Sequence, residues 1–397
     1  MIKIALLGST GSIGVQTLEV AARHRDRFEI ASLAAGKNVR AFFKQIDRFA
    51  PSVAALSVFP EEMKDRVFYD GEGAYTQAGG KKCRLYFGED AFLSAVVGEA
   101  DVVVVALVGF IGVKAVLKAA EAGKKIALAN KESLVVGGEL VMNAVESAGV
   151  ELAPVDSEHS AIWQALGCDR RAPFKKIVLT ASGGAFRDKS AEELKSVTAA
   201  EALKHPNWDM GGRITVDCAT MVNKGFEVAE AMRLYGASAE QIEVVVHPQS
   251  IIHSMVEFED NAVLAQLSYP TMEIPIQLAI AGERLQTACP PLDFVKLGKL
   301  TFLPVDREKY PCFYLTLESI KRGDNYPCAL NAADEVAVSA FLKGNIGFTD
   351  ITKVLEGVLA RTARAEISSL DDLVREDAKA RSLACKIITE INGTLTA

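Results

Sequence analysis

The first 150 residues alternate short apolar runs with segments of helical period. Apolar runs that are typical of buried strands cover residues 2–7, 28–33, 53–58, 101–108 and 125–129. Between them, apolar positions recur three and four residues apart, as in helices that bury one face, near residues 15–22, 41–49, 113–122 and 140–148. Strands that alternate with helices predict a parallel sheet covered on both faces. We therefore predict an α/β fold with an N-terminal Rossmann-like domain over residues 1–150.

The remaining sequence predicts two further domains. Strand patterns at 150–155, 176–181, 242–246 and 262–267, with a helix running to residue 234, indicate a central α+β domain over residues 151–285. Residues 247–255 can add a strand to a sheet used for dimerisation, and we assign His253 no role. A connector rich in proline and glycine, residues 286–311, leads to a helical bundle over residues 312–397. In that bundle Asn331 and Asp334 are predicted at a helix start.

Composition narrows the class of protein. Hydrophobic residues make up 49% of the chain and charged residues 24%, which is ordinary for a globular protein. A net charge of −7 excludes nucleic-acid binding through bulk positive charge. Seven cysteines without a CxxC pair favour a reducing cytoplasm, and the chain opens on a strand without a leader pattern. No apolar run is long enough to cross a bilayer.

A glycine-rich turn follows the first predicted strand. Gly8, Gly11 and Gly14 are spaced at i, i+3 and i+6, which departs from the common GxGxxG spacing. Small residues still let the backbone approach a pyrophosphate, and the following helix presents free N–H groups. Thr10 and Ser12 add hydroxyl donors. The turn therefore predicts a dinucleotide site, although a plain tight turn would give the same pattern.

The ends of two other strands refine the ligand. No acid occurs at residues 34–38, where an NAD enzyme usually carries one for the ribose, and Lys37 offers a cation for a 2′-phosphate. We therefore favour NADP, with a solvated surface lysine as the alternative. Asn130 and Lys131 follow the strand at 125–129, where Asn130 can bind ribose or nicotinamide and Lys131 an anionic substrate. The alternative there is an ordinary loop.

Two acids, Asp156 and Glu158, follow the predicted strand at 150–155. In extended backbone, residues two apart point to the same side, so both carboxylates can converge on one point. Hard oxygen ligands of this kind suit Mg²⁺ or Mn²⁺. The alternative is a helix start, with Asp156 or Ser157 as the cap and Glu158 as a first-turn acid.

Three further segments carry candidate chemistry. Residues 182–184 (SGG) follow a strand and can offer backbone amides to a phosphate. Residues 204–212 combine proline, glycine, His205 and Trp208, which indicates an active-site lid, or else a core tryptophan beside a surface histidine. Asn223 and Glu227 share a helical face beside Lys224, which can bind substrate oxygens, phosphate and metal, or form an exposed polar face.

Taken together, these stretches resemble the 1-deoxy-D-xylulose 5-phosphate reductoisomerase family. The likeness covers nearly the whole chain, and the order and spacing of the motifs make it specific. The matching pieces are residues 8–14 (GSTGSIG), 35–38 (AGKN), 129–132 (ANKE), 155–159 (VDSEH), 182–184 (SGG), 205–208 (HPNW), 223–227 (NKGFE), 247–250 (HPQS) and 330–335 (LNAADE).

The resemblance implies an activity. Members of the family rearrange and reduce 1-deoxy-D-xylulose 5-phosphate to 2-C-methyl-D-erythritol 4-phosphate, the committed step of the non-mevalonate isoprenoid pathway, and they are homodimers. The implied cofactors are NADPH and Mg²⁺ or Mn²⁺, with Co²⁺ as a further possibility.

The resemblance also implies roles for single residues. The metal ligands would be Asp156, Glu158 and Glu227. Lys131, Asp156, Glu158, Lys224 and Glu227 would serve catalysis. The substrate would contact Lys131, Ser157, Glu158, Ser182, His205, Trp208, Cys218, Asn223, Lys224 and Glu227. NADPH would contact Thr10, Gly11, Ser12, Ile13, Gly36, Lys37, Asn38, Asn130, Glu132 and Gly211.

One departure from the family pattern concerns the phosphate. Position 218 is cysteine, where the family usually has serine. A thiol is a poorer hydrogen-bond donor than a hydroxyl, so the phosphate would be held more weakly unless Ser182 and Asn223 suffice. Asp334 stands where asparagine is commoner, outside the implied site.

The residue types alone do not decide between two reaction mechanisms for the rearrangement. Lys224 is the best candidate to stabilise or protonate an oxyanion, in either a retro-aldol/aldol sequence or a one-step migration. Two rival functions remain: a metal-assisted NADP oxidoreductase of another sugar phosphate, and a non-catalytic NADP-binding sensor. The sensor does not explain three acids and a lid-like loop.

Overall fold

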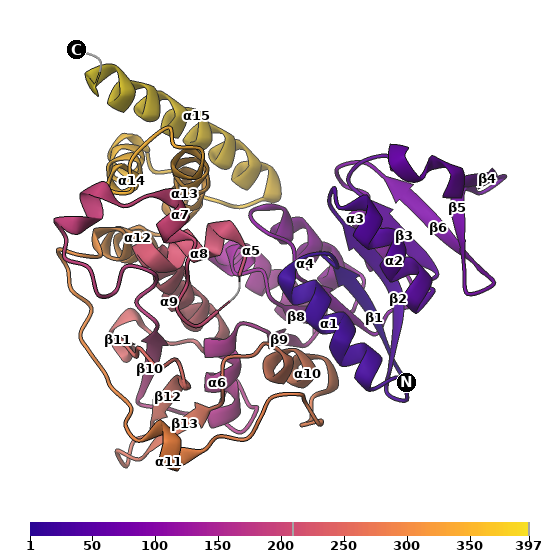
Figure 1. Ribbon diagram of the computed structural model, residues 1–397, viewed down its shortest axis with the longest axis horizontal. Helices are drawn as coiled ribbons and strands as arrows, with labels where there is room; N and C mark the ends of the chain where they lie inside the picture. Colours follow the sequence, from indigo (N-terminus) through magenta and orange to yellow (C-terminus); the bar gives the residue numbers. More distant parts are fainter. Residues whose placement is uncertain (209, 396–397) are drawn as a thin grey trace. The chain divides into compact units, whose positions relative to one another are not determined.

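A computed structural model describes residues 1–208 and 210–395 (Figure 1). By their internal contacts these residues form two compact units. The first unit comprises Met1–Ser133, Val141–Ser160 and Thr271–Cys289, and the second comprises Leu134–Leu140, Ala161–Pro270 and Pro290–Ala397. The chain thus enters each unit more than once.

The first unit is built on one mixed sheet. Its strand order is β4-β5-β6-β3-β2-β1-β7-β8-β9, and neighbouring strands from β6 to β9 are parallel. The strands are β1 (Ile2–Leu7), β2 (Phe28–Ala35), β3 (Val53–Leu56), β4 (Phe68–Asp70), β5 (Gly73–Ala78), β6 (Lys81–Phe87), β7 (Val102–Val105), β8 (Lys125–Leu128) and β9 (Leu152–Pro154).

Burial explains why the parallel strands form. The four consecutive valines of β7 are all buried, and β1 is fully buried from Ile4 to Leu7. Such runs suit a sheet covered on both faces. The helices connecting or covering it are α1 (Ser12–Arg23), α2 (Val39–Phe49), η1 (Glu61–Arg66), α3 (Phe92–Val96), α4 (Ile111–Glu121) and α10 (Glu273–Ala281), while α5 (Glu132–Ala148) and α6 (Ser157–Ala165) contain residues of both units. The predicted α/β class and Rossmann-like sheet are confirmed.

One part of this sheet was not predicted from the sequence. Strands β4, β5 and β6 lie between residues 68 and 87, where no strand was predicted, and β4–β5 and β5–β6 pair antiparallel. Charged residues Lys81, Lys82 and Arg84 interrupt the apolar pattern here, so periodicity gave no signal. Lys82 and Arg84 both pair with Asp70 at 2.6 Å. Helix α10 was also missed, because Pro275 lies in its first turn and proline is uncommon within a helix.

The second unit combines a small sheet with a helical bundle. The sheet has the order β11-β10-β12-β13, with β10–β11 parallel and the other pairs antiparallel. Its strands are β10 (Lys176–Ala181), β11 (Ile242–Val246), β12 (Ile252–Glu257) and β13 (Val263–Leu267). Its helices are η2 (Glu193–Ser196), α7 (Ala199–Ala202), α8 (Gly212–Thr220), α9 (Val222–Tyr235), η3 (Ala239–Gln241), α11 (Phe294–Leu297), α12 (Pro311–Arg322), α13 (Tyr326–Leu342), α14 (Asp350–Arg361) and α15 (Leu370–Leu395).

The predicted C-terminal helical bundle is confirmed, and it contains helices α12 to α15. Aromatic rings pack at the centre of their core, where Phe348 meets Phe186 edge-on at 5.0 Å between ring centroids and Phe341 at 5.6 Å. Buried aliphatic side chains, including Val354 and Leu355 of α14, surround these rings. Within the described part of the chain, no helix is both long and apolar enough to cross a membrane.

The prediction for Asn331 and Asp334 was wrong. Both lie in the middle of α13 and are fully buried, because the helix already begins at Tyr326 with a proline tolerated in its first turn. Arg213 of α8 reaches them, with its guanidinium 2.8 Å from Asn331 Oδ1 and 3.5 Å from Asp334 Oδ2. A buried polar cluster therefore joins two helices of the second unit.

Asp334→Asn should stabilise the protein at neutral pH. Burial, opposed by Arg213 and reinforced by Glu335, raises the pKa of Asp334 from 3.8 to about 6. The folded state then binds more protons than the unfolded state between these values, so this group's contribution to stability is present below about pH 4 and lost as pH rises to about 6. We expect the variant to gain about 1–3 kcal/mol in free energy of unfolding at pH 7.5 and little at pH 4.

Urea unfolding at several pH values measures this gain. Glu356→Gln, which removes an exposed carboxylate from the same bundle, is the matched control. A gain that is equal at pH 4 and pH 7.5 would count against a titrating Asp334.

Candidate active site

Two positions admit only glycine where β1 leads into α1, one in the turn and one in the first turn of the helix. Gly8 has φ +90°, and a Cβ there would lie 2.2 Å from the carbonyl oxygen of Ala106. A Cβ on Gly14 would lie 2.2 Å from the Gly8 carbonyl oxygen. The chain therefore turns tightly into α1, and Gly11 and Ser12 are exposed at its N-terminus. A helix N-terminus reached by a tight glycine turn is suited to a phosphate group.

The neighbouring strand β2 ends beside this turn. Gly8 and Ser9 donate backbone N–H bonds of 2.8 and 2.9 Å to the carbonyl oxygen of Ala34. Gly36, Lys37 and Asn38 follow and are exposed, and the Asn38 side chain caps α2 by accepting from the Ala41 N–H at 3.3 Å. The cap fixes the backbone next to Lys37, whose ammonium remains available at the carboxyl end of the sheet.

Asn130 is engaged in the loop around it. Its amide donates to the carbonyl oxygens of Leu107 and Gly109, each at 3.0 Å, and to Glu132 at 2.7 Å, while its oxygen accepts from Ser133 N–H at 3.0 Å. Glu132 also accepts from the Gly109 N–H at 3.0 Å. Asn130 and Glu132 therefore shape the loop at 107–109, and their predicted part in cofactor binding would act through that loop.

The acid pair lies at a helix start, not in extended backbone. Strand β9 ends at Pro154 and α6 begins at Ser157, so the predicted i, i+2 geometry was wrong and the alternative of a first-turn Glu158 is the observed one. The two acids nevertheless offer carboxylate oxygens within 4.8 Å of each other. Ser157 Oγ donates to Glu158.

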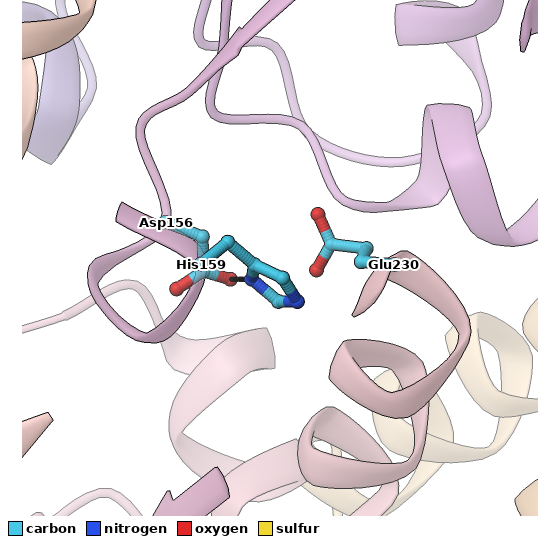
Figure 2. Close-up of side chains that lie close together, drawn as sticks. All are labelled: Asp156, His159 and Glu230. Carbon is cyan, nitrogen blue, oxygen red and sulfur yellow. Dashed lines mark ion pairs between the residues drawn. The ribbon is translucent and has the colours of Figure 1, made fainter. Parts of the chain in front are cut away.

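Two cationic or titratable groups accompany Asp156. Lys131 Nζ lies 2.9 Å from Asp156 Oδ2, and the lysine is almost completely buried. Figure 2 shows the His159 ring beside the same carboxylate, with Nδ1 at 4.0 Å from Oδ2; Glu230, also drawn there, belongs to α9. Lys131 thus neutralises part of the charge of an acid that would otherwise be costly to bury.

In the second unit, Ser182 and His205 form a directed pair. His205 Nδ1 accepts the backbone N–H groups of Asn207 at 3.2 Å and Trp208 at 3.0 Å. The ring proton of the neutral form must then be on Nε2, which donates to Ser182 Oγ at 2.9 Å. Ser182 Oγ also accepts from the Gly184 N–H at 3.1 Å. Its own hydroxyl proton can therefore be directed to an anion.

Cys218 borders this turn. A Cβ on Gly184 would lie 2.5 Å from both the Cys218 carbonyl oxygen and the Ala219 Cα. The absence of a side chain at Gly184, which has φ +69°, thus lets α8 approach the 182–184 turn. Cys218 is partly exposed there, which is compatible with its predicted substrate contact.

Helix α9 carries the third acid. Glu227 is 1% exposed and accepts hydrogen bonds from Asn223 Nδ2 and Lys224 Nζ on the same helix. The predicted shared face of Asn223, Lys224 and Glu227 is therefore observed. Two side-chain donors fix the orientation of its carboxylate, which is what a metal ligand requires.

The structure shows two sets of contacts beside Trp208 that the sequence did not predict. The His253 ring, to which no role was assigned, meets Trp208 edge-on at 6.1 Å between ring centroids. Asn207 donates to the Pro248 carbonyl oxygen at 3.0 Å and to Ser250 Oγ at 2.7 Å. The 247–250 motif therefore holds the 205–208 loop. Their separation of about forty residues gave no local signal; Asp209 of the predicted lid lies outside the described residues, and Gly211 is the N-cap of α8.

The donor types fit the cofactors that the sequence predicts. Asp156, Glu158 and Glu227 offer only hard oxygen ligands, which Mg²⁺ and Mn²⁺ prefer. The tight turn at Gly8–Gly14, with no room for a Cβ at either end, fits a backbone that approaches a pyrophosphate. Together, the parallel sheet and this turn define a dinucleotide-binding α/β protein of the Rossmann-like class.

Comparison with known proteins gives the family. Residues 4–138 match the 1-deoxy-D-xylulose 5-phosphate reductoisomerase family, residues 152–235 its C-terminal domain, and residues 267–383 the family described as DXP reductoisomerase C-terminal domain. The protein of that name from Geobacillus kaustophilus is 49% identical over 388 residues, covering 97% of this chain and 99% of that relative. The chain belongs to the 1-deoxy-D-xylulose 5-phosphate reductoisomerase family.

Solved structures agree with this assignment. A reductoisomerase from Zymomonas mobilis in complex with NADPH is 40% identical, with a TM-score of 0.87 over 98% of this chain and 99% of that chain. A DOX-P reductoisomerase in complex with NADPH, fosmidomycin and magnesium is 36% identical, with a TM-score of 0.91 over 99% of each chain. The similarity is thus both in sequence and in fold along the whole length.

Proposed function

We propose that the chain converts 1-deoxy-D-xylulose 5-phosphate to 2-C-methyl-D-erythritol 4-phosphate with NADPH and a divalent cation. The observation that carries this proposal is the oriented set Asn223, Lys224 and Glu227 on α9, in a chain that matches the family from end to end. An amide, an ammonium and a carboxylate on one helical face provide hydrogen bonds, positive charge and a metal ligand for one phosphorylated sugar.

Asp156, Glu158 and Glu227 are the proposed metal ligands. The first two are adjacent at the start of α6, and the third is held by its own helix. A bound Mg²⁺ or Mn²⁺ supplies a Lewis acid that lowers the cost of negative charge on the substrate's carbonyl and hydroxyl oxygens. Lys131 Nζ pairs with Asp156 Oδ2 at 2.9 Å, and Ser157 Oγ donates to Glu158, so both carboxylates are oriented by neighbouring side chains.

The substrate's phosphate is assigned to the second unit. Ser182 directs its hydroxyl proton outward, because its oxygen already accepts from His205 and Gly184. Cys218, Asn223 and Lys224 complete this end, and Trp208 covers the sugar. Phosphate binding fixes orientation and contributes binding energy to the reacting end, although the phosphate itself does not react. We assign Lys224, whose Nζ donates to Glu227, the role of stabilising or protonating an oxyanion.

NADPH is assigned to the first unit, where it supplies hydride. Thr10, Gly11, Ser12 and Ile13 at the N-terminus of α1 would hold its pyrophosphate. Gly36, Lys37 and Asn38 would hold its 2′-phosphate. Asn130 and Glu132, and Gly211 of the second unit, are the remaining residues predicted to contact NADPH. The proposal includes the predicted domains. Residues 1–150 bind NADPH, and residues 151–285 bind metal and substrate and carry the lid loop and the dimerisation sheet. Residues 286–311 form a connector, and residues 312–397 form the C-terminal helical domain.

Lys37→Ala should weaken NADPH binding about tenfold and leave NADH binding almost unchanged, since only NADPH has a 2′-phosphate for the ammonium to contact. Fluorescence titration with both cofactors measures this ratio. Lys44→Ala on α2 removes a second lysine from the same unit and serves as the control. Equal losses for NADPH and NADH would remove the argument for a 2′-phosphate contact.

One assay tests the proposed function. NADPH oxidation is followed with 1-deoxy-D-xylulose 5-phosphate and Mg²⁺ or Mn²⁺, and then with EDTA in excess. The proposal requires turnover that EDTA abolishes and added metal restores. Faster turnover with another sugar phosphate would favour the oxidoreductase alternative, and NADPH binding without any metal-dependent oxidation would favour a sensor.

We also propose a cytoplasmic homodimer. The supporting feature is β13 at the edge of the second sheet, which exposes Val263 by 51% and Leu264 by 52%. An edge strand with exposed aliphatic side chains is suited to pairing with a second copy. Sedimentation equilibrium with Leu264→Lys tests the pairing.

A further inference from the structure

Helix α8 borders the 182–184 turn of the second unit, which is proposed to bind the substrate's phosphate. It begins immediately after the loop that carries His205 and Trp208, and it carries Cys218 in its last turn. Cys218 and Ala219 approach Gly184 so closely that backbone atoms meet without an intervening side chain. This contact fixes the position of α8 relative to the turn. Any shift of α8 along its axis would therefore change the space beside Ser182.

Arg213, the second residue of α8, forms hydrogen bonds and ion pairs with several side chains. Its guanidinium lies 2.9 Å from Glu335 Oε1 and 2.8 Å from Asn331 Oδ1, both on α13. Asp334 of α13 and Asp217 of α8 each lie at 3.5 Å. The planar fork of a guanidinium fixes direction as well as distance, which apolar packing of α8 alone does not.

Helix α15 extends this network of hydrogen bonds and ion pairs. Glu335 uses its second oxygen to accept from Arg381 of α15, and Arg381 also pairs with Asp377 at 2.6 Å. Asn331 Nδ2 donates to Glu335 Oε1 at 3.2 Å. Polar and charged side chains thus connect α15 to α13, and α13 to α8, the helix that borders the 182–184 turn.

We propose that Arg213 is a positioning residue for the substrate's phosphate, and that α13 and α15 act on the phosphate-binding turn through it. Arg213 holds α8 at the register in which Cys218 meets Gly184. This inference rests on the proposed function and goes beyond it, since it gives the C-terminal helices a part in substrate affinity. In this proposal Arg213 acts through α8 and not by contact with the substrate or the cofactor.

Steady-state kinetics of Arg213→Gln and Arg213→Lys test the proposal. For Arg213→Gln we expect KM for 1-deoxy-D-xylulose 5-phosphate to rise about tenfold or more, with kcat and KM for NADPH within about twofold of the wild type. Arg213→Lys should restore part of the loss, because it keeps the charge but not the fork. Arg361→Gln removes an exposed α14–α15 ion pair with Glu390 in the same bundle and should change none of these values.

The variant Arg381→Gln and a direct measurement of phosphate binding provide two further tests. Arg381→Gln should raise the same KM a few-fold, and it decides the matter if Arg213→Gln does not fold. Calorimetric titration with inorganic phosphate needs no turnover and should show weaker binding in both variants. Unchanged KM and phosphate affinity in folded variants, or an equal rise for NADPH, would overturn the inference. Absence of turnover in the wild-type protein would instead overturn the proposed function.

Discussion

Glu227→Gln should lower metal-dependent turnover about a thousandfold while leaving NADPH binding nearly unchanged. The amide can still occupy the space between Asn223 and Lys224 on α9, but it no longer offers an anionic ligand to the cation. Losing several kcal/mol of charge stabilisation corresponds to a factor of this size. Measured together, kcat and the affinity for NADPH separate a lost metal ligand from a damaged fold.

Asp156→Asn should behave similarly, with one difference. Its carboxylate also pairs with Lys131 at 2.9 Å, so the variant removes a negative charge from beside a nearly buried ammonium. We expect an added loss of stability there. Glu243→Gln, which removes a carboxylate paired with Lys176 on the surface of the second unit, is the control for both variants. Near-normal rates in either Glu227→Gln or Asp156→Asn would contradict the metal assignment.

Gly14→Ala should weaken NADPH binding at least about a hundredfold. The added Cβ would lie 2.2 Å from the Gly8 carbonyl oxygen and 2.6 Å from the Ser9 Cα, and backbone at this position cannot give way without opening the turn. An opened turn displaces the N–H groups at the start of α1 that would face the pyrophosphate. Fluorescence titration with NADPH measures the loss, and circular dichroism establishes that the variant folds.

Gly98→Ala is the matched control, because a Cβ there would meet nothing within 4 Å in the same unit. It should leave NADPH affinity unchanged. An unaltered affinity in a folded Gly14→Ala variant would show that the turn is not the pyrophosphate site.

Sequence was sufficient where a pattern is local. The four valines of β7 and the helical period of α12 to α15 were predicted because burial in these elements follows directly from periodicity. The shared face of Asn223 and Glu227 was predicted for the same reason, since residues four apart in a helix are always neighbours. Motif order then supplied the family, which no single motif establishes.

Sequence was insufficient where tertiary contacts decide. Strand β6 pairs with β3 across a gap of about thirty residues, and its charged residues conceal it. Glu158 was assigned to extended backbone because the end of β9 at Pro154 carries no clear signal. The contact of His253 with Trp208 and the burial of Asp334 beside Arg213 depend on the packing of distant segments. Each of these features depends on contacts between segments far apart in the sequence, which local patterns do not encode.

The most direct test is anomalous diffraction from crystals grown with Mn²⁺, NADPH and 1-deoxy-D-xylulose 5-phosphate. We expect one anomalous peak about 2 Å from carboxylate oxygens of Asp156, Glu158 and Glu227, with the substrate's oxygens completing the coordination. A peak that Glu227 does not reach, or a bound substrate whose carbonyl lies far from the cation, would contradict the account.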